Sequence, residues 1–200
     1  MDTRRVNESV HKICNAITQS TKSYVMLRKE KQRINISDMG NIYVLTKGNV
    51  SAHSYNNGFL IATISAEEII GLESIRDVRI INYIRCVTDA EMYVISINDA
   101  CDLFTELGLW EAAFDVILRY MMVQSRREIK LNQPTSRSTV IEYIKHIWTF
   151  KPEQREKTSI YVYVMARTNI SRSLIHKVIT DLERKGLVLV RRGVLINCDM

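Results

Sequence analysis

The side chains best suited to chemistry in this chain lie in a short segment near its C-terminus. Arg172, Ser173, His176 and Lys177 are so spaced that on a helix they share one face within about one turn. The planar fork of an arginine matches the O6/N7 edge of guanine or a phosphate group. The polar neighbours could follow the same groove. This set favours nucleic-acid recognition over bond-making chemistry, and a solvated helix face is the alternative.

The same segment carries the pattern of an amphipathic helix. Ser171 stands ahead of it as an N-cap, and Gly186 stands where a helix-terminating glycine is common. The apolar residues recur at three- and four-residue spacing, and they are Leu174, Ile175, Val178, Ile179 and Leu182. Upstream, residues 160–165 predict a short first helix and residues 168–170 a tight turn. Downstream, two β-rich runs at 187–190 and 194–197 are joined by residues 191–193.

A helix, a turn, a helix and a small basic hairpin make up a winged helix-turn-helix. In that geometry the second helix lies in the major groove and the hairpin, or wing, touches the DNA backbone. Side chains near the helix N-terminus would contact phosphate. The predicted DNA contacts are Thr168, Asn169 and Ser171 on phosphate, Arg172, Ser173, His176 and Lys177 in the groove, and Arg191 and Arg192 from the wing.

The excess positive charge is confined to the same third of the chain. Residues 134–200 contain twelve Lys and Arg against six Asp and Glu, a net +6, whereas residues 1–133 contain sixteen of each. A basic domain beside a neutral one is typical of a nucleic-acid binder with a separate sensing or dimerising part. A basic surface that does not bind nucleic acid would give the same count of charges.

Enzyme and metal chemistry find no support in the sequence. The cysteines Cys14, Cys86, Cys101 and Cys198 show neither CxxC nor paired spacing, which predicts free thiols and no metal site. There is no HExxH, P-loop or GxGxxG motif. The N-terminus lacks the apolar core of a signal peptide, and no apolar run reaches the ~20 residues that span a bilayer. We expect a cytoplasmic protein that is not an enzyme, with no cofactor and no membrane partner.

Residues 1–100 predict a β-rich domain that begins with an amphipathic segment at 7–20. The apolar face of that segment holds Val10, Ile13, Cys14 and Ile17. From residue 24 to residue 97, short β-rich runs alternate with turn signals at 38–40, 47–49 and 55–58. Many short strands at regular spacing favour an antiparallel sandwich or roll.

A long apolar helical face follows the β-rich domain. Apolar residues repeat at intervals of three and four across residues 98–131, and Gly108 predicts a break before a longer helix. We predict that this helix pairs with a second copy of the chain. Packing on the chain's own β domain is the alternative, and both can hold on opposite faces. The predicted dimer contacts are Trp110, Phe114, Ile117, Leu118 and Met121.

The domain organisation follows from these patterns. Residues 132–136 contain Pro134 among polar neighbours and are the best candidate for a hinge. Residues 138–150 predict another amphipathic helix, and residues 151–157 predict a charged loop. The predicted domains are a sensor-like β-roll at 1–100, a dimerisation helix at 101–133 and a winged helix-turn-helix at 134–200.

In this order of parts the chain resembles, over nearly its whole length, the family of the cyclic-AMP receptor protein and the fumarate–nitrate reduction regulator, the CRP/FNR family. Residues 43–50 (YVLTKGNV) look like the family's YxLxxGxV hairpin, and residues 69–71 (IIG) look like its F-F/I-G strand. Residues 170–188 look like its recognition helix. More narrowly, residues 167–173 (RTNISRS) resemble a segment of the small enterobacterial IprA/YaiV-type regulators.

The resemblance implies an α+β fold: an N-terminal antiparallel β-roll like a cyclic-nucleotide-binding domain, a long dimerisation helix and a C-terminal winged helix-turn-helix. It implies a bacterial transcription regulator that binds a pseudo-palindromic site in double-stranded DNA as a homodimer. RNA polymerase is a further partner that the resemblance implies.

Departures from the family pattern narrow these expectations. Relatives that bind cyclic nucleotide carry a Glu directly after the strand glycine and an Arg-Ser pair further on; here Leu72, Ile80 and Ile81 stand at those positions. A cyclic phosphate needs a cationic fork and donors in a buried site, so the roll is predicted not to bind cyclic AMP. An unidentified small or apolar ligand, or a roll filled by its own side chains, stays open. A single Cys14 cannot form the iron–sulfur cluster of other relatives.

The recognition helix departs from the family as well. Ser173 stands where the family usually has Glu, and Lys177 supplies the second basic contact, so the family's base specificity is not carried over. A second class of function therefore stays open, in which the chain is a ligand-sensing or protein-interaction module whose winged helix docks a protein partner.

Overall fold

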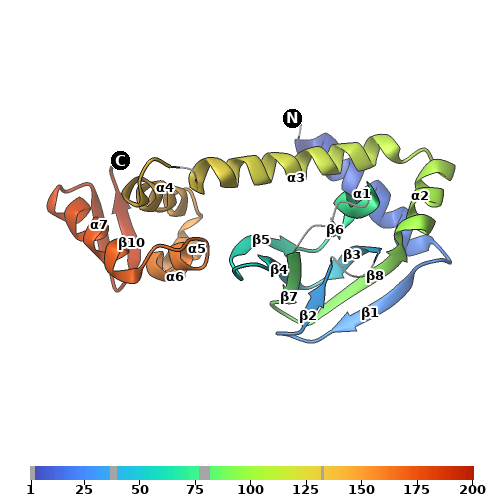
Figure 1. The fold of residues 1–200 in the computed structure, drawn as a ribbon, viewed down its shortest axis with the longest axis horizontal. Coiled ribbons are helices and arrows are strands. Elements are labelled where there is room, and N and C mark those ends of the chain that lie inside the picture. The colour runs from blue at the N-terminus through green and yellow to red at the C-terminus, as the bar shows by residue number, and fades with distance from the viewer. Residues whose placement is uncertain (1–2, 37–39, 77–81, 132) are drawn as a thin grey trace. The chain divides into compact units, whose positions relative to one another are not determined.

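The computed structural model describes residues 3–36, 40–76, 82–131 and 133–200 (Figure 1). The chain divides into two compact units, Met1–Met122 and Val123–Met200. The predicted fold class is confirmed: the first unit is an antiparallel β-roll with helices, and the second is a winged helix-turn-helix. Among the described helices, none combines the length and the apolar character needed to cross a membrane. The domain limits given above stay a prediction.

The roll consists of two four-stranded sheets whose neighbouring strands are all antiparallel. One sheet has the order β1 (Tyr24–Arg28), β8 (Ala90–Ser96), β3 (Asn41–Lys47) and β6 (Glu68–Ile70). The other has the order β2 (Arg33–Asn35), β7 (Asn82–Cys86), β4 (Asn49–Ser54) and β5 (Leu60–Ser65). The predicted strand-rich stretch is thus confirmed, and the turns at 47–49 and 55–58 separate strands; residues 38 and 39 lie outside the described part.

Strand β3 is buried on both of its faces, because one face packs against the other sheet and the opposite face packs against helices. Alternate side chains of a strand point to opposite faces. Tyr43 and Leu45 pack between the two sheets, whereas Ile42 and Val44 pack against helices on the outer face of the first sheet. Such apolar side chains form a buried cluster between the sheets, in which Tyr43 is 1% exposed.

The segment after Gly71 corrects one expectation. The run continuing from residue 71 was predicted to be β-rich, but Leu72–Arg76 form a short 3-10 helix, η1. Gly71 has a φ of +89°, which turns the chain out of the sheet, and a Cβ at this position would lie 2.9 Å from the carbonyl oxygen of Asn41. Glycine is therefore needed where β6 ends.

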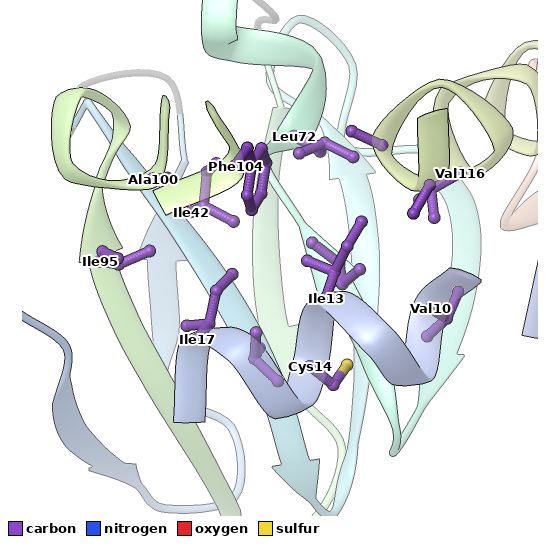
Figure 2. Packing of buried hydrophobic residues seen from close by; sticks show 14 residues of the cluster. Val10, Ile13, Cys14, Ile17, Ile42, Leu72, Ile95, Ala100, Phe104 and Val116 are labelled. Atoms are coloured by element: carbon purple, nitrogen blue, oxygen red, sulfur yellow. The ribbon is translucent and has the colours of Figure 1, made fainter. Parts of the chain in front are cut away.

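Three helices cover the outer face of the first sheet: α1 (Thr3–Gln19), α2 (Ile97–Glu106) and α3 (Trp110–Leu131). Figure 2 shows Val10, Ile13 and Ile17 of α1 in one cluster with Phe104 and Val116. The predicted apolar face of α1 is thereby confirmed, as is the helix break at Gly108. Buried Asp115 joins α3 to α1, because it accepts hydrogen bonds from Arg5 Nε at 3.0 Å and Ser9 Oγ at 2.9 Å.

Helix α3 has two different faces within this unit. Val116 is fully buried in the cluster and Ile117 packs against it, which confirms that the helix packs on its own β domain. Phe114 and Met121 are 60% and 63% exposed, and Trp110 is 39% exposed. Ile117 therefore belongs more to the internal face than the predicted dimer set assumed.

A polar cluster joins α3 to the sheet edge beside η1. Arg119 forms an ion pair with Glu68, and the Tyr120 hydroxyl donates a hydrogen bond to the carbonyl oxygen of Ile69. Glu68 and Arg119 are both half-buried at this edge. One carboxylate oxygen of Glu73, Oε2, is buried and has no hydrogen-bond partner among the described residues. Burial raises the pKa of Glu73 above its ordinary value of 4.5.

The second unit has a single apolar core. Its elements are α4 (Ser136–Trp148), α5 (Pro152–Glu156), α6 (Ile160–Met165), α7 (Arg172–Arg184), β9 (Val188–Arg191) and β10 (Val194–Cys198). Residues 151–157 were predicted to be a charged loop, and this prediction is wrong. Pro152 opens a short helix there, because a proline at the first helical position has its φ preset and needs no backbone partner.

Glu73 predicts a pH dependence of stability. Because its pKa is higher in the folded chain than in the unfolded chain, its contribution to stability is complete below pH 4.5 and is lost as the pH rises through the raised value. Glu73→Gln should therefore gain stability relative to the unaltered chain as the pH rises. Urea unfolding at about pH 4 and about pH 8 measures this difference. Glu106→Gln, at an exposed position, is the control, and an equal pH dependence in all three proteins would contradict the prediction.

Candidate nucleic-acid interface

Helix α7 begins at a well-formed cap. The Ser171 side chain accepts a hydrogen bond from the Leu174 backbone N–H at 3.3 Å, with φ and ψ of −67° and 150°, as an N-cap residue requires. Gly186 follows the helix with a φ of +71°, the conformation in which many helices end. The predicted limits of this helix are therefore confirmed.

The apolar stripe of α7 fixes which residues face outward. Ile175, Val178, Ile179 and Leu182 are each at most 2% exposed and pack in the core of the unit. The side chains between them must then point away from that core. Those predicted to read DNA are all exposed, and they are Arg172, Ser173, His176 and Lys177. The helix thus presents a continuous polar face.

The turn between α6 and α7 changes one assignment. Asn169 is exposed, but Thr168 is buried, at 7% exposure. The Thr168 hydroxyl donates to the Val164 carbonyl oxygen at 2.9 Å and accepts from the Ile170 N–H at 3.3 Å. Because the Thr168 hydroxyl makes its hydrogen bonds within the turn, it stabilises the turn. We therefore do not include Thr168 among the side chains proposed to contact phosphate.

The wing is a two-stranded antiparallel hairpin of β9 and β10. Arg192 and Gly193 occupy its turn with φ values of +50° and +80°, the combination that a tight two-residue hairpin turn needs. Arg191 and Arg192 are both exposed. The wing therefore offers two cations at its turn.

Among the described residues, the cations of this face take part in no internal ion pair. In the part of the second unit that the structure describes, the ion pairs are Arg137–Asp181, Lys145–Glu142 and Lys185–Asp181. None of these pairs includes a cation predicted to contact DNA: Arg172, Lys177, Arg191 or Arg192. Arg137 lowers the pKa of Asp181 by hydrogen bonding and fastens α4 to α7. The outward cations remain open to an anionic partner.

Tyr161 was missed at the level of sequence. Its hydroxyl lies 3.1 Å from His176 Nδ1, and the guanidinium carbon of Arg172 lies 4.8 Å from the centre of its ring. The residue lies between Ile160 and Tyr163 in an apolar run that reads only as core. The sequence does contain a signal: Tyr161 directly follows Ile160, and because neighbouring residues on a helix point in different directions, Tyr161 should lie at the margin of the core.

The remaining His, Cys, Asp and Glu side chains were compared with the arrangements that hold metal ions. Among the described residues no group of three His, Cys, Asp or Glu side chains is arranged to hold a metal ion. The four cysteines are free thiols. Burial, the largest cause, raises the pKa of the Cys14 thiol to about 12, so it stays protonated at neutral pH.

Comparisons with known proteins agree with this architecture. The family described as winged helix-turn-helix DNA binding matches residues 136–199. The c-di-GMP-responsive global regulator CLP of Xanthomonas campestris is 13% identical, with a TM-score of 0.70 over 97% of this chain and 100% of that one. A CooA variant from Carboxydothermus hydrogenoformans is 9% identical, with a TM-score of 0.64 over 93% and 86% of the two chains.

A transcriptional regulator of the CRP/FNR family from Thermus thermophilus is 14% identical, with a TM-score of 0.58 over 87% of this chain and 94% of that one. Among curated protein sequences no match is found. The predicted resemblance to the CRP/FNR regulators is confirmed in the fold. The narrower resemblance to the IprA/YaiV-type regulators stays a prediction.

The cap on α7 gives a prediction about stability. Ser171→Ala removes the side-chain acceptor for the Leu174 N–H and should lower the free energy of unfolding of the second unit by about 1 kcal/mol. Ser171→Asp keeps an acceptor at the cap and should retain most of that stability. Urea unfolding of the full chain, followed by Trp148 fluorescence in a Trp110→Phe background, measures the difference. Equal stability of the Ala and Asp variants would show that the cap contributes nothing.

Proposed function

We propose that this chain, which has the fold of the CRP/FNR regulators and ends in a winged helix-turn-helix domain, is a sequence-specific DNA-binding regulator of transcription that acts as a homodimer. The observation that carries the proposal is the exposed polar face of α7, whose cations have no internal carboxylate partner among the described residues, beside a wing with two further exposed arginines. Such a face would place charge and hydrogen-bond donors against a major groove.

The side chains of that face divide by the contacts they suit. Arg172, in the first turn of α7, has the planar fork that can bind guanine bidentately. His176 and Lys177 lie one turn further along the same face and could follow the groove. Ser171 and Asn169 lie near the helix N-terminus, where a phosphate is favoured by the backbone N–H groups. Arg191 and Arg192 would contact the backbone without reading sequence.

The homodimer is supported by the exposed face of α3. Trp110, Phe114 and Met121 recur at one-turn and two-turn spacing, and all are exposed beside a helix face that is already packed on the roll. Exposed apolar residues in such a row commonly mark an interface. Two copies related by a twofold axis would bind two half-sites about 34 Å apart, which gives a pseudo-palindromic site.

We propose that the roll does not bind cyclic AMP. Leu72, at the position of the family's Glu, has an alkyl side chain with no hydrogen-bonding group, and it is fully buried in the cluster between the first sheet and the helices. Tyr43, Leu45 and Met92 occupy part of the space between the sheets with apolar side chains. Ile80 and Ile81 lie outside the described residues. We also propose that a regulator with this fold interacts with RNA polymerase. We further propose that the protein is located in the cytoplasm.

Arg172→Ala tests the DNA-reading role. The variant should lose roughly 1–3 kcal/mol of binding to a selected DNA duplex while it keeps most of its affinity for random DNA. Duplexes are first selected from a random library with the unaltered full chain, and binding is then titrated by fluorescence anisotropy at several salt concentrations.

Arg184→Ala is the matched control, since it removes an exposed arginine from the far end of the same helix. It should weaken binding to selected and random duplexes equally. If the unaltered chain prefers no sequence, the regulator proposal fails, and a winged helix that docks a protein partner takes its place.

Phe114→Glu tests the dimer. Because Phe114 is 60% exposed, the substitution leaves the core intact but places a charge in the proposed seam. Losing one buried aromatic side chain there should weaken association by at least about tenfold. Sedimentation equilibrium of the full chain measures the association constant, with Phe114→Leu as a control that remains apolar. Identical association of both variants and the unaltered chain would place the dimer contact elsewhere.

A further inference from the structure

Tyr161 of α6 contacts both the exposed polar face of α7 and the turn of the wing. Its hydroxyl is 3.1 Å from His176 Nδ1, and Arg172 lies over its ring with the guanidinium carbon 4.8 Å from the ring centre. A Cβ built on Gly193, in the turn of the wing, would lie 3.2 Å from Tyr161 Cδ2. One half-buried side chain thus joins three parts of the unit that are separate in sequence.

Contact with one ring restricts two long, exposed side chains. Arg172 and His176 are four residues apart, so both lie on the same face of α7. A guanidinium within about 6 Å of a tyrosine ring is attracted to its face. The hydrogen bond to Nδ1 orients the imidazole, leaving Nε2 as the ring nitrogen free of Tyr161. Restricting these side chains before binding reduces the conformational entropy that DNA recognition would otherwise lose.

The wing is held against the residues that directly precede Tyr161. The Ile160 backbone N–H donates to the Gly193 carbonyl oxygen at 2.8 Å, and Ser159 forms a β-bridge with Val194. Gly193 has no Cβ, so the Tyr161 ring can approach the turn closely. Tyr161 therefore lies where α6, the start of α7 and the turn of the wing meet.

We propose that Tyr161 is a positioning residue that orients Arg172 and His176 relative to the wing and thereby sets the sequence specificity of DNA binding. This inference rests on the proposed function. Tyr161 acts on DNA through these neighbours, so it affects discrimination between sequences more than general affinity. Its contribution depends on two separable parts, the ring under Arg172 and the hydroxyl beside His176.

Two substitutions separate those parts in the DNA-free full chain. Tyr161→Phe keeps the ring and removes the hydroxyl, whereas Tyr161→Leu removes both. Tyr163→Phe, in the same helix, is the matched control because Tyr163 stacks with Arg167 instead. NMR reads the ring-current shift of the Arg172 side-chain protons and the 15N chemical shift of His176 Nδ1. Tyr161→Phe should change only the His176 signal, Tyr161→Leu should change both, and the control should change neither.

A double-substitution cycle then measures the effect on DNA binding. With a duplex selected by the unaltered chain, Tyr161→Leu should weaken binding roughly tenfold and Tyr161→Phe about two- to threefold. Binding of a random duplex should stay within about twofold. In an Arg172→Ala background, Tyr161→Leu should lose most of its effect, because the partner it positions is absent.

The outcomes separate the two proposals. If the unaltered chain selects no sequence, the regulator proposal falls and this one falls with it. If it does select one, but Tyr161→Leu and Arg172→Ala are additive or Tyr161→Leu weakens selected and random duplexes equally, Tyr161 is a core residue and only the positioning role is overturned. Unchanged Arg172 and His176 signals in Tyr161→Leu also overturn it.

Discussion

The burial of one stripe on α7 is the constraint on which the rest of the candidate interface depends. Four apolar side chains at helical spacing are packed in the core of the second unit, so the rotation of the helix about its axis is fixed. Each of them stabilises the unit by roughly 1.5–3 kcal/mol through burial. Turning the helix to hide Arg172 or Lys177 would expose those side chains and bury charge without a partner, which costs far more than surface contacts could return. The outward polar face is thus a consequence of the core.

In the roll, burial likewise fixes which side chains face which way, but with the two-residue period of a β-strand. In β3, burial on both faces means that a one-residue slip would exchange Ile42 and Val44 with Tyr43 and Leu45, placing a tyrosine under the helices and isoleucine between the sheets. The two faces differ in size and shape, so the register is specified even though all four residues are buried. α3 follows the same logic: its inner face closes the cluster with α1, and its outer face keeps Phe114 and Met121 uncovered.

Periodicity explains how far the sequence could predict this structure. The helices α1, α3, α4 and α7 and the strand-rich stretch were predictable because each repeats apolar residues at the period of its element. The short helix α6 was also predicted, at residues 160–165, but α5 and η1 were not. α5 is polar and has no apolar stripe, and η1 arises from the backbone turn at Gly71, which makes contact with Asn41, distant in sequence.

In the candidate interface, the outward residues of α7 followed from the pattern, because exposure is the complement of burial. Two features did not. Thr168 is polar and adjacent to the helix, yet its hydroxyl is used by Val164 and Ile170, a local hydrogen-bond choice that residue type alone does not reveal. Tyr161 reads as core, and its polar role appears only when α6, α7 and the wing are brought together.

These positions suggest a division between affinity and specificity. Contacts from Arg191 and Arg192 to phosphates would act on any sequence and weaken with salt, because they release counterions. Discrimination needs side chains with a defined orientation toward base edges, and each good bidentate contact is worth roughly 1–3 kcal/mol. Of the exposed residues on α7, Arg172 and His176 are the ones held by a neighbouring ring, whereas Lys177 forms no ion pair in the described part of the chain. Under the proposed function, Arg172 and His176 would supply the discrimination between sequences, and the exposed cations of the wing would supply affinity for any DNA.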